Sequence, residues 1–518
     1  RETGEQFIFL HLGEEKKPPT RIRQKDNAVL SLEQWIMDDS KRNLEHVKDI
    51  AIKELLSLRY KAPFDDLDIA QKANKENSQT FHSVIDASNV VTDVEGTGLL
   101  HVAPGAGKED FDLGKKENLP VISVISDDAT YLEGMGEFSD KNAKKHPELI
   151  IDFLKTHESG KYLLKTMRYT HRYPACWRCK TELVWKVTDE WYIAMDKKDK
   201  SGKTYREQMV EVAKKINWIP SWGLDRELDW LKNMHDWLIS KKNRYWGLAL
   251  PIYECEKCGN FEVLGGKEEL KKKSTEGWEK FEGNSPHKPF IDEVKIKCIK
   301  CGEIVSRVDD VGNVWLDAGI VPFSTMPEEY FPADFITESF PGQFKNWFYS
   351  LIAMSTALKN TNPFKTVLGY ASVRDEKGEE MHKSKGNSIE FNEAADRIGV
   401  DVMRWMYARQ NPEHNLNFGL KTADEVRRQF HLMLWNIYNF FITYAIVDKW
   451  DREEKHIPSK ETILDKWILS RLSGTAHVAT NALKEYDAHR ASLEIAEFIE
   501  DLSLWYIRRS RERVGSSN

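Results

Sequence analysis

The sequence predicts a multidomain protein in which α+β and α/β units, a zinc ribbon and a C-terminal α-helical bundle occur along one chain. Three observations support this fold class. The length of 518 residues corresponds to about three or four domains. All six cysteines fall into C-x-x-C pairs, which are typical of zinc modules rather than of disulfide frameworks. After residue 420 the apolar residues change from mixed spacings to a purely helical spacing.

The composition is that of a soluble globular protein. Apolar residues make up 40% of the chain and charged residues 31%, and the 17 Trp and 23 Phe exclude a disordered chain. The longest apolar runs, such as residues 439–447, are shorter than the roughly 18 to 20 residues that cross a bilayer. Because the net charge is −7, nucleic acid would have to be bound by local basic patches. We therefore expect no membrane association.

The first ten residues resemble the middle of a strand. They contain no initiator Met, no basic stretch of a signal peptide and no small-residue cleavage site. We therefore expect a cytoplasmic protein and a chain whose beginning lies upstream of Arg1.

The first 160 residues predict an α+β unit. Residues 121–125 read as a strand, and residues 40–58 and 139–157 have helical apolar spacing. The next segment, residues 161–250, is rich in Trp and Tyr.

Residues 306–420 predict an α/β unit, because short strands alternate with helices there. Within this unit, residues 347–358 carry apolar side chains on most faces, as a buried helix does. Residues 421–518 predict a helical bundle from apolar residues that recur every three or four positions. The positive charge of the bundle is concentrated in four arginines between residues 508 and 513.

Residues 251–305 predict a zinc ribbon. Its ligands are expected to be Cys255, Cys258, Cys298 and Cys301. A C-x-x-C turn brings two thiolates close enough to share one tetrahedral ion. Each of these two pairs is followed by a glycine, Gly259 or Gly302, which favours the tight turn of a zinc knuckle.

The remaining pair, Cys176 and Cys179, has no partner pair in this chain. It could bind a second zinc ion with two ligands from a segment outside the chain, act as a redox pair, or be a buried structural remnant. We favour zinc, because a redox C-x-x-C is expected at the start of a helix after a strand, whereas Tyr173 and Pro174 lead into a turn.

The most informative segment is residues 380–387. After Glu380 it reads Met381, His382, Lys383, Ser384, Lys385, Gly386 and Asn387. Two lysines that flank a serine and precede a glycine can meet a polyphosphate with ammonium groups, a hydroxyl and backbone N–H groups. Taken alone, such a loop is also common on ordinary protein surfaces.

In its context, this segment resembles the K-M-S-K-S signature loop of the class I aminoacyl-tRNA synthetases. Other segments resemble motifs of the same family in the same order: residues 244–251 its R-Y-W-G-x-P segment, residues 314–319 its V-W-F-D-S-G segment, residues 338–348 its E-G-x-D-Q-x-R-G-W-F segment, and residues 502–510 a helix of its anticodon-binding bundle. Residues 96–110 are similar to the hydrolytic editing insertion of the isoleucine, valine and leucine enzymes. Of these three, the isoleucine enzyme is the most similar and the valine enzyme is the alternative.

The resemblance implies a domain plan. Residues 1–160 would be part of the editing domain, which is α+β or β-rich, and residues 161–250 would return into the catalytic domain. Residues 251–305 would be the zinc ribbon. Residues 306–420 would be the second half of a Rossmann-type α/β catalytic domain, and residues 421–518 the start of the anticodon-binding bundle.

The resemblance also implies roles for individual residues. Lys383, and Lys385 beside it, would stabilise the charge on ATP, while Met381, His382, Ser384, Gly386 and Asn387 would contact the nucleotide. Glu338, Gln343 and Trp347 would surround the aminoacyl adenylate; the alternative for Trp347 is a core residue. Asp110 and His101 would belong to the editing pocket, and Arg508 and Arg509 would contact tRNA. His101 taken alone would more often be a core histidine.

The chain departs from the family pattern at several positions. Glu380 replaces the first lysine of the signature loop and His382 its first serine, so Lys385 would have to compensate for a missing cation. The stretch from Glu338 to Trp347 has one extra residue, and Gly342 stands where Asp is usual. The H-I-G-H motif and the threonine-rich strip of the editing pocket are expected upstream of Arg1. A piece without them is not expected to form adenylate by itself.

The implied partners are ATP with Mg²⁺, isoleucine and tRNA(Ile), with one or two Zn²⁺ ions, and we expect a monomer. Two other readings remain. A zinc-dependent RNA-binding protein without catalysis would explain the cysteines and the C-terminal arginines, but would leave Lys383 and Asp110 without a purpose. A free-standing hydrolase of mischarged tRNA would not need residues 306–518.

Overall fold

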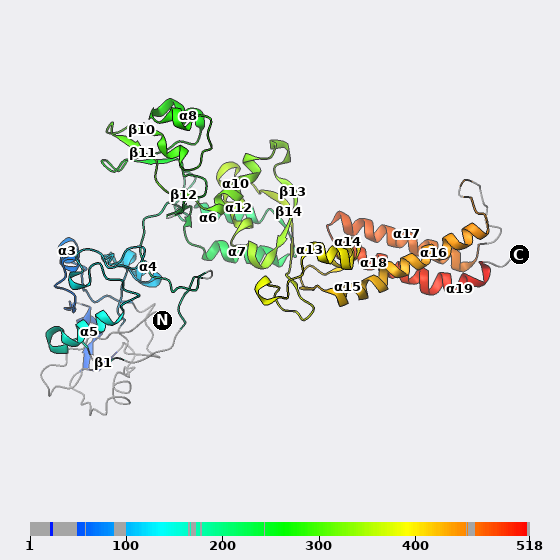
Figure 1. Cartoon of the computed structure of the whole chain (residues 1–518), viewed down its shortest axis with the longest axis horizontal. Coiled ribbons are helices and arrows are strands. Elements are labelled where there is room, and N and C mark those ends of the chain that lie inside the picture. The colour runs from blue at the N-terminus through cyan, green and yellow to red at the C-terminus, as the bar shows by residue number, and fades with distance from the viewer. Residues whose placement is uncertain are drawn as a thin grey trace. The chain divides into compact units, whose positions relative to one another are not determined.

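The computed structural model describes residues 21–23, 49–56, 58–87, 100–163, 166, 172–176, 179–242, 244–451, 453 and 461–514 (Figure 1). The chain divides into two compact units, Arg1–Asp189 and Glu190–Asn518.

Unit 1 combines short helices with irregular segments. Its elements are β1 (Arg21–Arg23), β2 (Asp49–Ala51), α2 (Ile52–Leu55), α3 (Asp68–Glu76), α4 (Lys108–Glu117), α5 (Glu148–Thr156) and the 3₁₀ turns η1 (Gly136–Phe138) and η2 (His157–Gly160). The strands β1 and β2 pair in parallel. The ring of Phe138 is 1% exposed and meets Phe153 edge-on, with ring centroids 5.3 Å apart. These aromatic contacts form a small core.

Two sequence-based expectations for unit 1 need correction. Residues 121–125 do not form a strand: Ile125 makes one isolated antiparallel bridge with Tyr131. The chain turns back between these two residues, where Asp128 accepts the backbone N–H of Thr130, so the bridge joins the segment to its own hairpin arm. The helix expected over residues 139–157 is limited to α5 and follows Pro147, whose fixed φ suits a helix start. Of residues 40–58, the described part contains β2 and α2.

The centre of unit 2 is a three-stranded parallel sheet with helices packed on it (Figure 1). Its strands are β13 (Ala333–Ser339), β14 (Phe364–Tyr370) and β4 (Asn217–Ile219), in the order β13-β14-β4. The accompanying helices are α6 (Tyr205–Ala213), α7 (Trp222–Asn233), α10 (Val314–Ser324), α11 (Phe340–Gln343) and α12 (Trp347–Lys359). This alternation confirms the α/β prediction.

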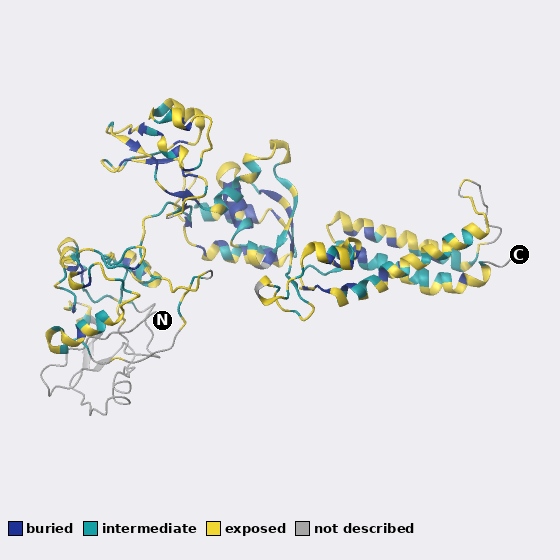
Figure 2. Cartoon of the chain, viewed as in Figure 1, coloured by how far each residue is buried: buried dark blue, intermediate teal, exposed yellow. Residues whose placement is uncertain are grey.

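Helix α12 is the central helix of this core. Its residues Phe348–Thr356 are all buried, which confirms the prediction of a buried helix, and they appear in dark blue in Figure 2. Phe340 is 1% exposed and fills the space beside two glycines. A Cβ atom at Gly369 would lie 1.8 Å from its ring, and one at Gly223 would lie 2.5 Å from it. Only glycine therefore fits at these two positions beside Phe340.

The ribbon of unit 2 consists of a hairpin and a three-stranded antiparallel sheet. The hairpin is β7 (Ile252–Glu254) with β8 (Phe261–Val263), and the sheet, in the order β11-β10-β9, contains β9 (Ser274–Glu276), β10 (Lys295–Lys297) and β11 (Ile304–Ser306). The helices α8 (Lys267–Lys273) and α9 (Trp278–Phe281) and the 3₁₀ turn η3 (Phe290–Glu293) connect them. Tyr253, Val294 and Ile296 lie in its core, each at most 2% exposed.

A parallel strand pair leads toward the helical part. It consists of β15 (Val373–Arg374) and β16 (Leu416–Asn417), and α13 (Phe391–Ile398) and α14 (Val400–Arg409) lie between them in sequence. The remaining short elements before α13 are β3 (Tyr192–Ile193), β5 (Trp237–Leu238), β6 (Ser240–Lys241), β12 (Val311–Gly312), η4 (Glu328–Tyr330) and η5 (Lys383–Lys385).

The C-terminal part is helical, which confirms the predicted bundle. It contains α15 (Leu420–Val426), the π-helical turn η6 (Arg427–His431), α16 (Leu432–Val447), α17 (Ile463–Lys484), α18 (Ala488–Glu500), the π-helical turn η7 (Asp501–Ile507), α19 (Arg508–Ser510) and η8 (Arg511–Arg513). Helix α17 begins with a capping box of Thr462 and Asp465. Helix α18 reaches back to α14, since Ser492 Oγ donates to Ala408 O at 3.2 Å.

One helical stretch among the described residues, Leu420–Val447, is long and apolar enough to cross a membrane by length and composition. This stretch contains the apolar run 439–447. It is longer than that run because it also includes the apolar residues before it, which polar residues interrupt. Core helices of bundles share this property, so it does not by itself indicate a membrane protein. Several of its large side chains are exposed, such as Trp435 at 57%, and much of α16 is drawn in yellow in Figure 2.

Candidate functional sites

The carboxyl ends of the parallel strands β13 and β14 place two polar side chains together. Glu338 and Ser339 lie opposite Gly369 and Tyr370 in the register. Glu338 Oε1 accepts the Tyr370 hydroxyl at 3.1 Å and the Ser339 N–H at 2.7 Å. Partial burial, and then the Glu338 carboxylate, raise the pKa of Tyr370. This edge is where open parallel sheets bind ligands, and Tyr370 is a residue that the sequence motifs did not single out.

Gln343 ends α11 next to this edge, and Trp347 begins α12. Gln343 Oε1 accepts the backbone N–H of Trp347 at 3.3 Å, so the amide caps the helix. Trp347 is half-buried and packs against the hydrophobic core of the sheet. The structure therefore gives both residues a local packing role, and their contact with an adenylate stays a prediction.

The lysine loop, residues 375–387, follows β15 and is closed by hydrogen bonds of its own. Asn387 Nδ2 donates to Asp375 Oδ2 at 2.9 Å and to Glu380 O at 3.0 Å. Asn387 Oδ1 accepts the N–H of His382 at 2.9 Å. The Asn387 amide and the backbone N–H groups of the loop hold the pKa of Asp375 below its usual range. Asn387 thus acts as a clip for the loop, a function that the sequence motif alone did not indicate.

The lysine loop that Asn387 closes carries two cations. Lys383 and Lys385 form the turn η5, which ends at Gly386 with φ +69°. Both lysines are exposed, and their ammonium groups make no ion pair with the described residues. Glu380 lies 3.5 Å from the Arg374 guanidinium, so its carboxylate is partly neutralised.

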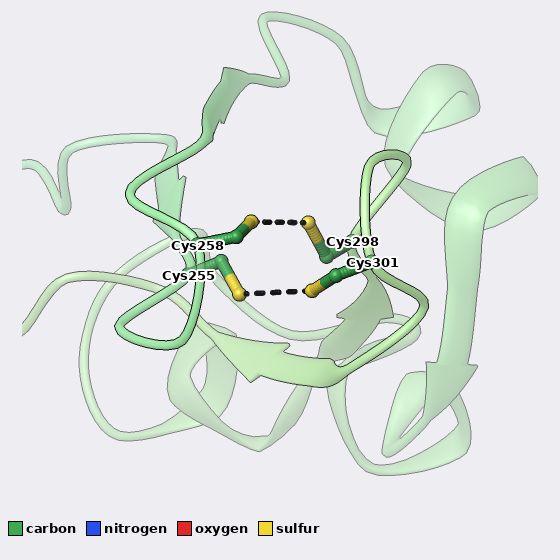
Figure 3. Close-up of side chains that lie close together, drawn as sticks. All are labelled: Cys255, Cys258, Cys298 and Cys301. Carbon is green, nitrogen blue, oxygen red and sulfur yellow. Dashed lines mark hydrogen bonds between the residues drawn. The ribbon is translucent and has the colours of Figure 1, made fainter.

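The four ribbon cysteines converge on one point (Figure 3). The Sγ atoms of Cys255 and Cys301 are 3.5 Å apart and those of Cys258 and Cys298 are 3.7 Å apart. All four lie within 4.8 Å of one another. These sulfurs are too far apart for disulfides, whereas about 3.8 Å is expected between the ligands of a tetrahedral ion with Zn–S bonds of about 2.3 Å.

The electrostatics of the cluster suit a cation. Backbone N–H groups, first that of Cys301 and then that of Lys300, lower the pKa of Cys298 to about 6, whereas the facing thiols raise the pKa of Cys301 against the effect of the Glu303 backbone N–H. The four sulfurs thus share their protons, and the first thiolate forms at Cys298. The residues present therefore fit a four-coordinate zinc ion.

Cys176 and Cys179 lie in unit 1 and form a turn by themselves. The N–H of Lys180 donates to Cys176 O at 2.8 Å, and Lys180 has φ +62°. Cys179 is exposed, and its Sγ lies 3.4 Å from Thr181 Oγ1. The Thr181 hydroxyl is the main reason that the pKa of Cys179 falls to about 7.

His101 and Asp110 lie close enough to interact electrostatically. Asp110 stands in the first turn of α4, and its Oδ2 accepts the N–H of Ala103 at 3.0 Å. Partial burial lowers the pKa of His101, while the Asp110 carboxylate opposes this shift. The carboxylate therefore also orders the segment that carries His101.

The C-terminal arginines have different environments. Arg508 and Arg509 are exposed on α19, and the Arg509 guanidinium stacks over Trp505 at 3.8 Å. Arg513 instead pairs with Asp465 at 2.7 Å, which draws the pKa of Asp465 far below its usual value. This pair secures the start of α17 and is not free for a ligand.

A parallel-sheet domain with a clipped lysine loop, followed by a helical bundle, matches a known family. The family model described as tRNA synthetases class I (I, L, M and V) matches residues 26–419, and the anticodon-binding domain of tRNA ligase matches residues 465–518. The chain belongs to the class I tRNA synthetases and comprises catalytic-domain and anticodon-binding segments of that family.

Individual relatives are isoleucine–tRNA ligases. The chain is 34% identical over 508 residues to that of Clostridium tetani, covering 96% of this chain and 46% of the relative. It is 36% identical over 478 residues to that of Methanocaldococcus jannaschii, covering 91% of this chain and 44% of the relative. The chain thus spans less than half the length of these relatives.

Among solved structures, a Mycobacterium tuberculosis methionyl-tRNA synthetase aligns with a TM-score of 0.46 at 14% identity. The alignment covers 67% of this chain and 58% of that chain. This likeness is too weak to add to the family match.

Proposed function

We propose that the gene product containing this chain attaches isoleucine to tRNA(Ile). In the first step the isoleucine carboxylate attacks the α-phosphate of ATP, forming isoleucyl adenylate and releasing pyrophosphate. In the second step the acyl group passes to the terminal ribose of the tRNA. The observation that carries the proposal is the clipped loop that holds Lys383 and Lys385 exposed and without anionic partners among the described residues.

The loop supplies what the first step requires. Charge accumulates on the phosphates as the α-phosphate is attacked, and fixed cations stabilise it. Mg²⁺ bound with ATP would share this task. Lys383 is the principal cation in the proposal and Lys385 replaces the family's first lysine. Glu338, at the carboxyl edge of the sheet, would bind the ammonium group of isoleucine.

The test is isoleucine-dependent ATP–pyrophosphate exchange by the gene product. Lys383→Ala should lower the exchange rate at least about 100-fold, the usual effect of removing one preorganised charge-stabilising group, and should change isoleucine binding little. Lys377→Ala is the matched control, because Lys377 is an exposed lysine of the same loop whose hydrogen bond to Asp375 comes from its backbone N–H, which the substitution keeps. Equal losses in the two variants, or no loss in either, would refute the role of Lys383.

We also propose that unit 1 contains a hydrolytic site that removes valine from tRNA(Ile). The isoleucine enzymes are themselves the standard illustration that a hydrophobic pocket separates isoleucine from valine by only about 1–3 kcal/mol, so a second site is needed. Asp110 would bind the ammonium group of valine, and His101 would line the pocket. Their electrostatic contact supports this pairing.

Asp110→Asn tests the hydrolytic site without breaking the fold. Asparagine retains an oxygen that can accept the Ala103 N–H but loses the charge. Deacylation of valyl-tRNA(Ile) should fall at least about tenfold, since a charge-assisted bond to an ammonium is lost. The control variant Asp112→Asn, which changes an exposed residue of the same helix, should deacylate valyl-tRNA(Ile) at the normal rate. Unchanged deacylation by Asp110→Asn would exclude the proposed role.

Zinc and tRNA complete the proposal. Cys255, Cys258, Cys298 and Cys301 would hold a structural Zn²⁺, which keeps the ribbon folded. Cys176 and Cys179 would supply two ligands of a second zinc site. Arg508 and Arg509 would contact tRNA phosphates from the exposed face of α19.

A further inference from the structure

Glu376 connects the lysine loop to the first helix of the bundle. Its Oε1 accepts the backbone N–H of Lys421 at 2.5 Å and that of Thr422 at 3.3 Å. These are unsatisfied N–H groups in the first turn of α15, and a carboxylate there also interacts favourably with the helix dipole. A residue 45 positions before Lys421 therefore caps this helix.

The helix has no cap of its own. The N-cap position is Gly419, whose φ of 174° is ordinary extended backbone. A Cβ atom on Gly419 would lie 2.1 Å from Cγ of Glu376. The glycine is thus required by the close approach of Glu376 and not by its backbone conformation, and the two residues form one complementary contact.

The two residues before Glu376 tie this contact to the loop and to the strand pair. Asp375 accepts Asn387 Nδ2 through Oδ2 and the N–H of Glu379 through Oδ1. On the preceding side, Phe418 N donates to Arg374 O at 2.7 Å, which continues the pairing of β15 with β16. The root of the loop is consequently held by the Asn387 clip on one side and by the start of α15 on the other.

We infer that Glu376 is a positioning residue for amino-acid activation: by capping α15 it fixes the root of the lysine loop, so that Lys383 and Lys385 extend from a defined base. This inference rests on the proposed function of the loop. Because the ammonium groups of the two lysines have no ion-pair partner among the described residues, their placement depends on how firmly the root is held. Glu376 itself is not assigned any contact with the substrates.

The experiment measures isoleucine-dependent ATP–pyrophosphate exchange and thermal unfolding of the gene product. Glu376→Ala should lower kcat roughly tenfold or more, as misplacement of a catalytic group by about 1 Å can do, with little change in KM for isoleucine. Glu376→Gln keeps an accepting oxygen and should retain most of the rate. Glu379→Ala, which removes an exposed carboxylate from the same loop, is the matched control and should behave as the unsubstituted protein.

A double variant separates positioning from stability. Adding Gly419→Ser to Glu376→Ala supplies a serine at the N-cap, which can satisfy the helix without touching the loop. The unfolding temperature should recover while kcat stays low. Recovery of both would show that Glu376 is only a helix cap, and an unchanged kcat in Glu376→Ala would equally overturn the inference. Measuring Lys383→Ala in the same assay distinguishes the failure of this inference from the failure of the proposed function. If neither Glu376→Ala nor Lys383→Ala lowers kcat, the proposed function fails. If Lys383→Ala lowers kcat strongly and Glu376→Ala does not, only the role of Glu376 is removed.

Discussion

The ribbon and the Cys176 segment contain the same turn in two different settings. In the ribbon, the N–H groups of Gly259 and Gly302 donate to Cys255 O and Cys298 O at 2.8 and 2.9 Å. In unit 1 the N–H of Lys180 donates to Cys176 O at 2.8 Å. The residue after the second cysteine has φ +66°, +79° and +62° in the three turns.

This comparison shows that the turn is encoded locally, whereas the metal site is not. The Cys176 segment has the same closing hydrogen bond and the same left-handed residue even though lysine replaces glycine there. Convergence of four thiols requires two such turns to face each other, and in the ribbon they are held by the β7–β8 hairpin and by β10 with β11. The Cys176 turn therefore offers two ligands and the ribbon four.

The largest expected effect is loss of the ribbon metal. Cys298→Ser should remove one bound zinc per chain and make the ribbon sensitive to proteolysis, because a structural zinc contributes on the order of 10 kcal/mol to the folded state of small zinc modules. Metal analysis and limited proteolysis measure this. Cys179→Ser should leave the ribbon resistant. If Cys298→Ser kept its zinc and its resistance to proteolysis, the convergence of the four thiols would not indicate a metal site.

A smaller effect concerns the reactivity of the open pair. The thiolate is the nucleophile, and a pKa of about 7 for Cys179 means that its alkylation in metal-free protein should rise through about pH 7 and be slow below it. Thr181→Val removes the hydroxyl that lowers this pKa, so alkylation at pH 7 should slow by roughly tenfold as the midpoint moves toward the ordinary thiol value. Mass spectrometry of the Cys179 peptide against pH follows both proteins. A midpoint unaffected by Thr181→Val would show that the hydroxyl does not stabilise the thiolate.

The smallest effect tests the left-handed position itself. A Cβ on Gly259 would meet nothing within 4 Å, so Gly259→Ala should cost only the backbone strain of φ +66°, about 1 kcal/mol. Lys180→Gly should have the opposite sign and at most a similar size. Thermal unfolding of the ribbon and of unit 1 reports the two changes. Destabilisation by Lys180→Gly would mean that the lysine side chain contributes more than its backbone strain costs.

Local and periodic features of the fold were predictable from the sequence, and long-range contacts were not. The four-thiol cluster follows from spacing and two glycines, and α12 from its apolar faces. The prediction of a strand at residues 121–125 was wrong, because the apolar pattern did not show that the described part of this segment would make a single bridge, to Tyr131, and no ladder. Arg513 was counted with the other C-terminal arginines as positive charge of the bundle, although Asp465, far away in sequence, forms an ion pair with it. The role of Asn387 as a clip depends on its contact with Asp375, 12 residues earlier, which the motif did not show.

The contact of Phe340 with Gly223 and Gly369 constrains how the chain can evolve. The three residues come from α7, α11 and β14, and enlarging either glycine requires Phe340 to shrink in the same lineage. Homologues with a smaller residue at position 340 should therefore be the ones in which these glycines vary, so that the three columns of an alignment change as a set. Phe340 also lies in the stretch that is one residue longer than the family pattern, so that insertion should be inherited together with both glycines.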